Sequence, residues 1–122
     1  MGVFVRIRGW LECDHRQLAQ VKEIVAAENP DRTYSGGWGF PARQYNWTSW
    51  VFFGADMREQ AVDCFLEQLR LVARIPASDD DNDLIIGLFL VSHEITGMSE
   101  WQIREGAVVI GRVNGAYQYL GE

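Results

Sequence analysis

The chain has 122 residues, of which 48% are hydrophobic and 23% are charged, a size and composition that fit a single domain over residues 1–122 with its own core. No run approaches the ~20 apolar residues of a membrane helix and the first residues lack the order of a signal peptide, so we expect a cytoplasmic protein without membrane contact. A net charge of −6 and a pI near 4.8 oppose binding to nucleic acid and favour a basic protein partner, although such a charge also serves ordinary solubility.

Residues 3–11 alternate in the manner of a β-strand, which places successive side chains on opposite faces. One face is purely apolar, and the other mixes aromatic rings with arginines. The apolar set is Val3, Val5, Ile7 and Leu11, and the mixed set is Phe4, Arg6, Arg8 and Trp10. The segment therefore predicts a strand with one side in the core.

A helix is predicted over residues 15–28. Asp14 and Gln17 have the spacing of a capping box, in which two side chains satisfy amides at the start of a helix. Apolar residues then recur at helical spacing as far as Val25. The pattern ends near Pro30, because proline cannot continue a helix.

Residues 31–46 show no period but are rich in glycine and in aromatic side chains, among them Trp38 and Tyr45. So many rings predict an ordered loop that packs on the domain. The glycines at 36, 37 and 39 do not have the lysine, serine or threonine of a phosphate-binding loop after them. We therefore expect them to allow a tight backbone turn beneath Trp38.

Residues 47–54 are apolar on both faces, which is typical of a strand inside a sheet. The next segment predicts an amphipathic helix that begins at Asp56, with Glu59 completing a second capping box, and that ends before Pro76. Its apolar stripe consists of Val62, Phe65, Leu66, Leu69 and Val72. Such a stripe needs a sheet face to cover.

The last third of the chain predicts three consecutive strands after an acidic loop. The carboxylates of residues 77–83 repel one another and favour a solvated surface loop, whereas residues 84–95 are mostly apolar and predict a central strand buried on both faces. Turns at Thr96-Gly97 and Glu105-Gly106 separate this strand from two more over residues 98–104 and 107–113.

The order β-α-β-α-β-β-β predicts an α+β fold. We expect a two-layer α/β sandwich with about five mostly antiparallel strands and both helices on one face, because connections are short and right-handed. A ferredoxin-like strand order within the same layers is a close alternative.

Two helices cover only one face of such a sheet, so the other face is a candidate interface. Exposed aromatic patches mark interaction surfaces, and tryptophan, tyrosine and arginine are frequent binding hot spots. We expect a protein partner to contact Trp10, Trp38, Tyr45, Trp50, Trp101, Asp79, Asp80, Asp81 and Asp83. A homodimer is one form of this interface. The alternative is that the 31–46 loop and the C-terminal tail fold over the face and bury it.

No catalytic constellation is present, so we do not expect an enzyme. Ser92, His93 and Glu94 are consecutive at a strand end, where neighbours point to opposite faces and cannot form a triad. The acidic loop lacks the glycine and the bidentate glutamate of a calcium loop, and Cys13 and Cys64 lack metal-type or disulfide spacing. We therefore expect no metal, cofactor or disulfide.

Two other classes of function have some support in the sequence. A small enzyme or ligand-binding domain would have an aromatic pocket near Trp38, Tyr45, Trp47 and His93. Arginines among aromatic rings on one strand also occur in platforms for single-stranded RNA, but the chain lacks the sequence motif of those platforms and its charge is adverse.

The glycine-rich SGGWGFP loop, the WTSWVFFGADMREQ junction and the apolar LIIGLFLV strand give the chain a family resemblance. It resembles the small cytoplasmic immunity proteins that bacteria encode beside secreted polymorphic or contact-dependent toxins. The resemblance implies a non-enzymatic inhibitor that blocks a toxin domain, often a basic nuclease, by tight binding. It assigns no functional residue.

Overall fold

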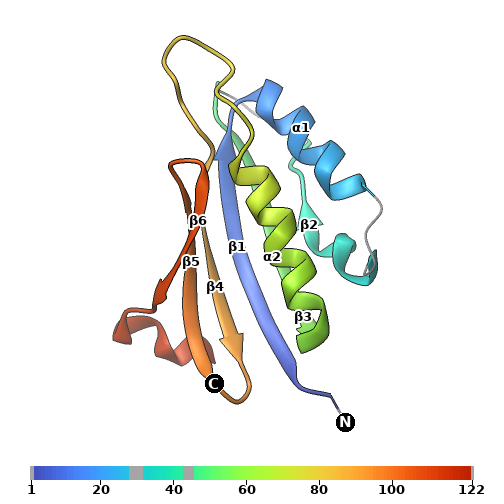
Figure 1. Ribbon diagram of the computed structural model, residues 1–122, viewed down its shortest axis with the longest axis vertical. Coiled ribbons are helices and arrows are strands. Elements are labelled where there is room, and N and C mark those ends of the chain that lie inside the picture. Colours follow the sequence, from blue (N-terminus) through green and yellow to red (C-terminus); the bar gives the residue numbers. More distant parts are fainter. Residues whose placement is uncertain (1, 28–31, 43–45, 122) are drawn as a thin grey trace.

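The computed structural model describes residues 2–27, 32–42 and 46–121. Within these ranges the chain forms one antiparallel sheet of six strands in the order β2-β3-β1-β4-β5-β6, with two α-helices packed against it (Figure 1). The elements are β1 Phe4–Cys13, α1 His15–Ala26, the 3-10 helix η1 Arg32–Gly37, β2 Trp38–Gly39, β3 Ser49–Arg58, α2 Glu59–Ala73, β4 Ile86–His93, β5 Gly97–Arg104, β6 Ala107–Arg112 and the 3-10 helix η2 Gly115–Gly121. The predicted α+β class is confirmed.

The sixth strand, β2, comes from the segment predicted as a loop. Trp38 pairs with Phe53 and Gly39 pairs with Phe52, so β2 extends the sheet beyond β3 by only two residues. Two residues are too few to produce an alternating pattern, which explains why the sequence predicted about five strands.

Strand β1 lies at the centre of the sheet between β3 and β4, and its predicted alternation is confirmed. Val5, Ile7 and Leu11 are buried, whereas Phe4 and Arg6 on the opposite face are exposed. The buried face meets both α-helices, whose apolar residues belong to the same core cluster. The two α-helices therefore share one face of the sheet (Figure 1).

The predicted capping box at the start of α1 is confirmed. The carboxylate of Asp14 accepts a hydrogen bond of 2.8 Å from the amide of Gln17, and the Gln17 side chain accepts one of 2.9 Å from the amide of Asp14. The buried Gln17 also donates to the carbonyl of Asp83 at 2.9 Å. The start of α1 is thus tied to the acidic loop.

The second predicted capping box is wrong. Asp56 lies in β3, which continues to Arg58, and α2 begins at Glu59 without a side-chain cap. The reason is that β3 pairs with β1 along its whole length, and Asp56 accepts a hydrogen bond of 2.8 Å from its cross-strand neighbour Arg6. Strand pairing has outweighed a local capping signal.

A cluster of aromatic rings fills the space between the sheet and α2. Phe53 lies 4.4 Å from Phe65 and 4.9 Å from Trp38 between ring centroids, and Phe65 lies 6.4 Å from Trp101. Trp38 and Trp101 are 8% and 4% exposed, so the prediction that they contact a partner is wrong. Both point to the helix-covered face, because Trp101 pairs with the buried Phe89 and Trp38 pairs with Phe53.

The strands predicted as buried on both faces are buried on one. Trp50 and Phe52 of β3 are 40% and 48% exposed, and Ile86 of β4 is 49% exposed, although β4 is central in the strand order as predicted. Trp47, expected inside the strand, precedes it and is 85% exposed. The physical reason is that the helices cover only the other face.

Candidate functional site

One end of the uncovered sheet face carries a band of apolar side chains. Trp10 on β1 lies between Phe52 on β3 and Leu88 on β4. In the next row, Glu12 lies between Trp50 and Ile86. We call this surface the open face, formed by Trp10, Glu12, Trp50, Phe52, Ile86 and Leu88. The paired strands fix the backbone positions from which these side chains project.

The other end of the same face is covered by the tail, as one alternative predicted. Arg8 donates a hydrogen bond of 2.7 Å to the carbonyl of Leu120 in η2, and Gly121 lies against Met98 and Ser92. The same alternative placed the 31–46 loop here, but its described part packs on the helix side through Trp38 and Tyr34. The face is therefore only partly covered.

Carboxylates are fixed beside the apolar band. Glu12 accepts a hydrogen bond of 3.1 Å from the ring nitrogen of Trp10, and Glu100 accepts one of 2.9 Å from Gln102. Both glutamates line a shallow hollow of about 350 Å³ with Trp10, Ile86 and Leu88. The lining also contains one cation, Arg104, so two carboxylates and one guanidinium give the hollow a net negative charge.

The acidic loop lies next to the open face. The carboxylates of Asp79, Asp81 and Asp83 lie within 4.8 Å of one another and are exposed, as is Asp80. The loop borders a hollow of about 690 Å³ that shares Glu12 and Ile86 with the open face. The predicted acidic segment and the predicted anchors Trp10 and Trp50 thus form one continuous surface.

Asp14 fastens the acidic loop to the start of α1. Its carboxylate accepts hydrogen bonds from Ser78 and from the amide of Gln17. Partial burial raises the pKa of Asp14, but the bonds from Ser78 and from first-turn amides outweigh it and hold the pKa below its ordinary value of 3.8. Next to it, burial and the charge of Asp14 raise the pKa of the Cys13 thiol to about 12, so Cys13 stays protonated and unreactive at neutral pH.

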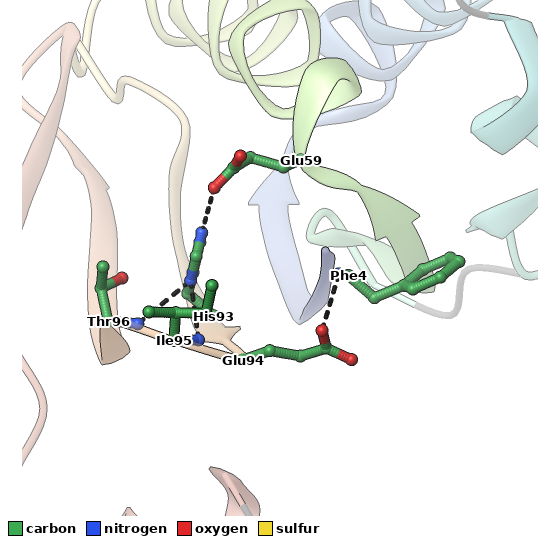
Figure 2. Close-up of polar contacts among 6 residues, drawn as sticks. All are labelled: Phe4, Glu59, His93, Glu94, Ile95 and Thr96. Atoms are coloured by element: carbon green, nitrogen blue, oxygen red, sulfur yellow. Dashed lines mark hydrogen bonds and ion pairs between the residues drawn. The ribbon is translucent and has the colours of Figure 1, made fainter. Parts of the chain in front are cut away.

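His93 lies at the opposite end of the sheet, where both nitrogens of its ring are engaged. Figure 2 shows its Nε2 directed at the carboxylate of Glu59, while its Nδ1 accepts hydrogen bonds of 3.0 and 3.1 Å from the amides of Ile95 and Thr96. Since Nδ1 accepts two amide protons, the ring proton lies on Nε2. The side chain joins the start of α2 to the β4–β5 turn and has no nitrogen left for a substrate.

Ser92, His93 and Glu94 do not contact one another as a triad would require. Glu94 accepts a hydrogen bond of 3.2 Å from the amide of Phe4, and the hydroxyl of Ser92 is buried without a hydrogen-bond partner among the described residues. Ser92 pairs with Arg6 and His93 with Val5, so the two side chains lie on opposite faces of the sheet. This arrangement agrees with the expectation that they form no triad.

The predicted aromatic pocket is not assembled by its described members. Trp38 lines a cavity of about 20 Å³, which is room for about one water molecule. Trp47 borders the acidic loop, and His93 lines a separate groove with Phe4 and Asp56. Tyr45, which was predicted for both this pocket and the partner interface, lies outside the described residues. The prediction of one pocket shared by Trp38, Trp47 and His93 is therefore wrong.

Several residues of the open face escaped the sequence prediction. The alternation of residues 47–54 places Phe52 on the same face as Trp50. Because the residues of the opposite face are apolar as well, the sequence did not show which of the two faces is exposed. Ile86 and Leu88 belong to the apolar residues 84–91, which predicted a strand buried on both faces. Glu12 gave no signal, because its importance arises only from its cross-strand neighbours.

Comparisons with protein-family models, with curated proteins and with solved structures find no significant match to this chain. No helix in the described ranges is long and apolar enough to cross a membrane.

Proposed function

We propose that the protein is a non-enzymatic cytoplasmic binding module that docks a basic protein partner on the open face and the adjoining acidic loop. In its sharpest form, the proposal is that the protein is an immunity protein that neutralises a cognate toxin domain by tight binding. The observation that carries the proposal is the band of exposed Trp50, Phe52 and Ile86 on a rigid sheet, beside fixed carboxylates.

The apolar band supplies the affinity in this proposal. Large aromatic side chains bury much area at small cost in conformational entropy, and they dominate the hot spots of protein interfaces. The strands already fix the backbone that carries these rings, so no loop has to be ordered on binding. Trp10 is additionally held by its bond to Glu12.

In this proposal the carboxylates determine that the favoured partner is basic. Three aspartates of the acidic loop, Asp79, Asp81 and Asp83, line the same hollow as Glu12, and the whole chain has a net charge of −6. Such a surface attracts a basic protein and raises the association rate, mainly at low salt. It repels phosphate backbones, which supports a protein rather than a nucleic acid as the partner.

The state of His93 supports a binding role over an enzymatic one. A general base needs a nitrogen within reach of the proton that it removes. In His93 both nitrogens are bonded inside the fold, to Glu59 and to the amides of the β4–β5 turn.

The experiment is a reconstitution with the product of the adjacent gene. The two purified proteins are mixed and separated by size-exclusion chromatography with light scattering, and toxicity of the adjacent gene is scored with and without this protein. A stable complex together with restored growth is expected. Failure to form a complex, with both proteins folded, would remove the immunity form of the proposal.

A further inference from the structure

The two edges of the sheet are built differently. Edge strands are usually protected by shortness, proline, lysine or a bulge, because their unpaired backbone groups can recruit another strand. At one edge, β2 has only two residues and Pro41 follows shortly after it. At the other, β6 has six residues, AVVIGR, without proline or lysine, and it pairs with β5 one-to-one from Ser99↔Arg112 to Arg104↔Ala107 without a bulge.

The turn that precedes β6 determines which of its backbone groups face outward. Glu105 and Gly106 form a two-residue turn, both with positive φ, and the pair that flanks such a turn exchanges both of its backbone hydrogen bonds. Pairing then alternates, so Val109 bonds to β5 whereas Val108 and Ile110 point their amides and carbonyls away from the sheet. Within the described part of the chain, no other hydrogen bond engages these two residues.

The side chains of β6 are also suited to pairing. Val109 and Ile110 are 47% and 52% exposed on opposite faces of the strand. β-Branched side chains of this kind favour strands and gain from packing against a neighbouring strand. The edge therefore offers both backbone bonds and apolar contact to an added strand.

We propose that the added strand is β6 of a second copy of this chain, paired antiparallel about a two-fold axis at Val109. The two sheets then join into one continuous sheet. Val108 of each copy pairs with Ile110 of the other, so the outward backbone groups of both copies are satisfied reciprocally, as a two-fold interface requires. This surface is the edge of β6, and the inference does not rest on the proposed function of the open face.

Strand length and charge select this register among the symmetric ones. An axis at Val108 would place Arg112 beyond the Glu105-Gly106 turn of the other copy, where β6 no longer offers a residue to pair with, and an axis at Ile110 would place Arg112 opposite the apolar Val108. With the axis at Val109, Arg112 lies opposite Gly106 and next to Glu105 of the other copy. Glu105 is exposed and only loosely paired, at 3.7 Å from Arg104, so the ends of the proposed interface are complementary.

The net charge of −6 opposes self-association, but its reach is short. At physiological salt, charges farther apart than ~8 Å are largely screened, and β6 itself carries no acidic residue. Local backbone bonds and apolar contacts therefore outweigh the repulsion between the two chains.

The test measures mass by sedimentation equilibrium from micromolar to near-millimolar protein. Wild type is expected to be a reversible dimer. Ile110→Pro removes the outward-facing amide of residue 110 and no hydrogen bond between β5 and β6. Because the two-fold axis repeats the contact, the substitution removes two hydrogen bonds from the dimer. It is therefore expected to raise the dissociation constant about ten-fold or more. Wild type that stays monomeric at every concentration would overturn the proposal, and so would a folded Ile110→Pro variant that dimerises as wild type does.

A charge exchange gives a second test that does not depend on the folding of the proline variant. Arg112→Glu and Glu105→Arg are each expected to weaken the dimer a few-fold, and the double variant is expected to restore it. If the double variant shows no recovery over the two single variants, the Val109 axis is refuted. Slower amide hydrogen exchange at Val108 and Ile110 at high protein concentration is the matching expectation for wild type.

Discussion

Tryptophan occurs on both faces of the sheet, but the helices pack against only one of them. On the covered face, Trp38 and Trp101 contact the rings of Phe53 and Phe65 and fill the core. On the open face, Trp50 keeps 40% of its surface exposed beside Phe52. The comparison separates aromatic residues that fill the core from those whose rings remain partly exposed on the open face.

The largest contrast is expected between Trp101→Ala and Trp50→Ala. Removing the buried Trp101 should leave a cavity among Phe65 and Phe89 and lower the free energy of unfolding by about 3–5 kcal/mol. Removing Trp50 should lower it by about 1 kcal/mol or less. Urea denaturation followed by circular dichroism measures both, and equal losses would mean that the open face also carries the fold.

A matched pair of glycines tests the same contrast without removing any side chain. A Cβ at Gly9 would lie 2.2 Å from the carbonyl oxygen of Leu88 and 2.7 Å from the ring of Phe89, so Gly9→Ala should cost roughly 1–3 kcal/mol of stability. A Cβ at Gly54, on the uncovered side of β3, would meet nothing within 4 Å, and Gly54→Ala should stay within about 0.5 kcal/mol of wild type. If thermal unfolding ranks the two variants in the reverse order, the assignment of the faces is wrong.

The two aspartates with capping-box spacing should behave differently. Asp14→Ala removes the observed cap and should cost about 1 kcal/mol, whereas Asp56→Ala loses only an exposed ion pair with Arg6 and should cost about 0–1 kcal/mol. The measurement is the urea midpoint at neutral pH, and a larger loss for Asp56→Ala than for Asp14→Ala would contradict the observed start of α2.

The pH dependence of Asp14 follows from its lowered pKa. The charged carboxylate stabilises the fold, so its contribution is present above the ordinary pKa of 3.8 and is lost as the pH falls through the lower folded-state pKa. The stability of Asp14→Ala should therefore approach that of wild type in strong acid. A gap between them that stays constant with pH would contradict the role of the charge.

The elements with strong periods could be predicted from the sequence, whereas the faces of the sheet could only partly be predicted. Val5, Ile7 and Leu11 alternate with polar or amphipathic neighbours, and this places β1 correctly. In β5, Trp101 and Ile103 alternate with Glu100 and Gln102, which itself favours burial of the tryptophan. Assigning Trp101 to the interface gave more weight to its residue type than to its period.

Other features could not be read locally. In β3 both alternating sets are apolar, so only the position of the helices decides that Val51 and Phe53 are buried and that Phe52 is not. Asp56 has capping-box spacing, yet its partner Arg6 lies far away in the sequence. The continuity of the acidic loop with Glu12 and Ile86 likewise depends on strand order.

The smallest effect on stability is expected in the acidic loop. Replacing Asp80 and Asp81 with asparagine should leave the free energy of unfolding within about 0.5 kcal/mol of wild type, because both side chains are exposed. The association rate with a basic partner should fall, and mainly at low salt, because exposed charges are screened beyond ~8 Å at physiological ionic strength. A rate that stays unchanged at every salt concentration would exclude the loop from the interface.

The most direct measurement is the affinity of the Trp50→Ala/Phe52→Ala double variant for the product of the adjacent gene, determined by calorimetry. The matched control is Leu71→Ala, which removes a similarly exposed apolar side chain from α2. We predict that the double variant keeps its fold by circular dichroism and loses about 2 kcal/mol or more of binding free energy, while the control binds as wild type does. Wild-type affinity in the folded double variant would contradict the claim that the open face is the binding surface.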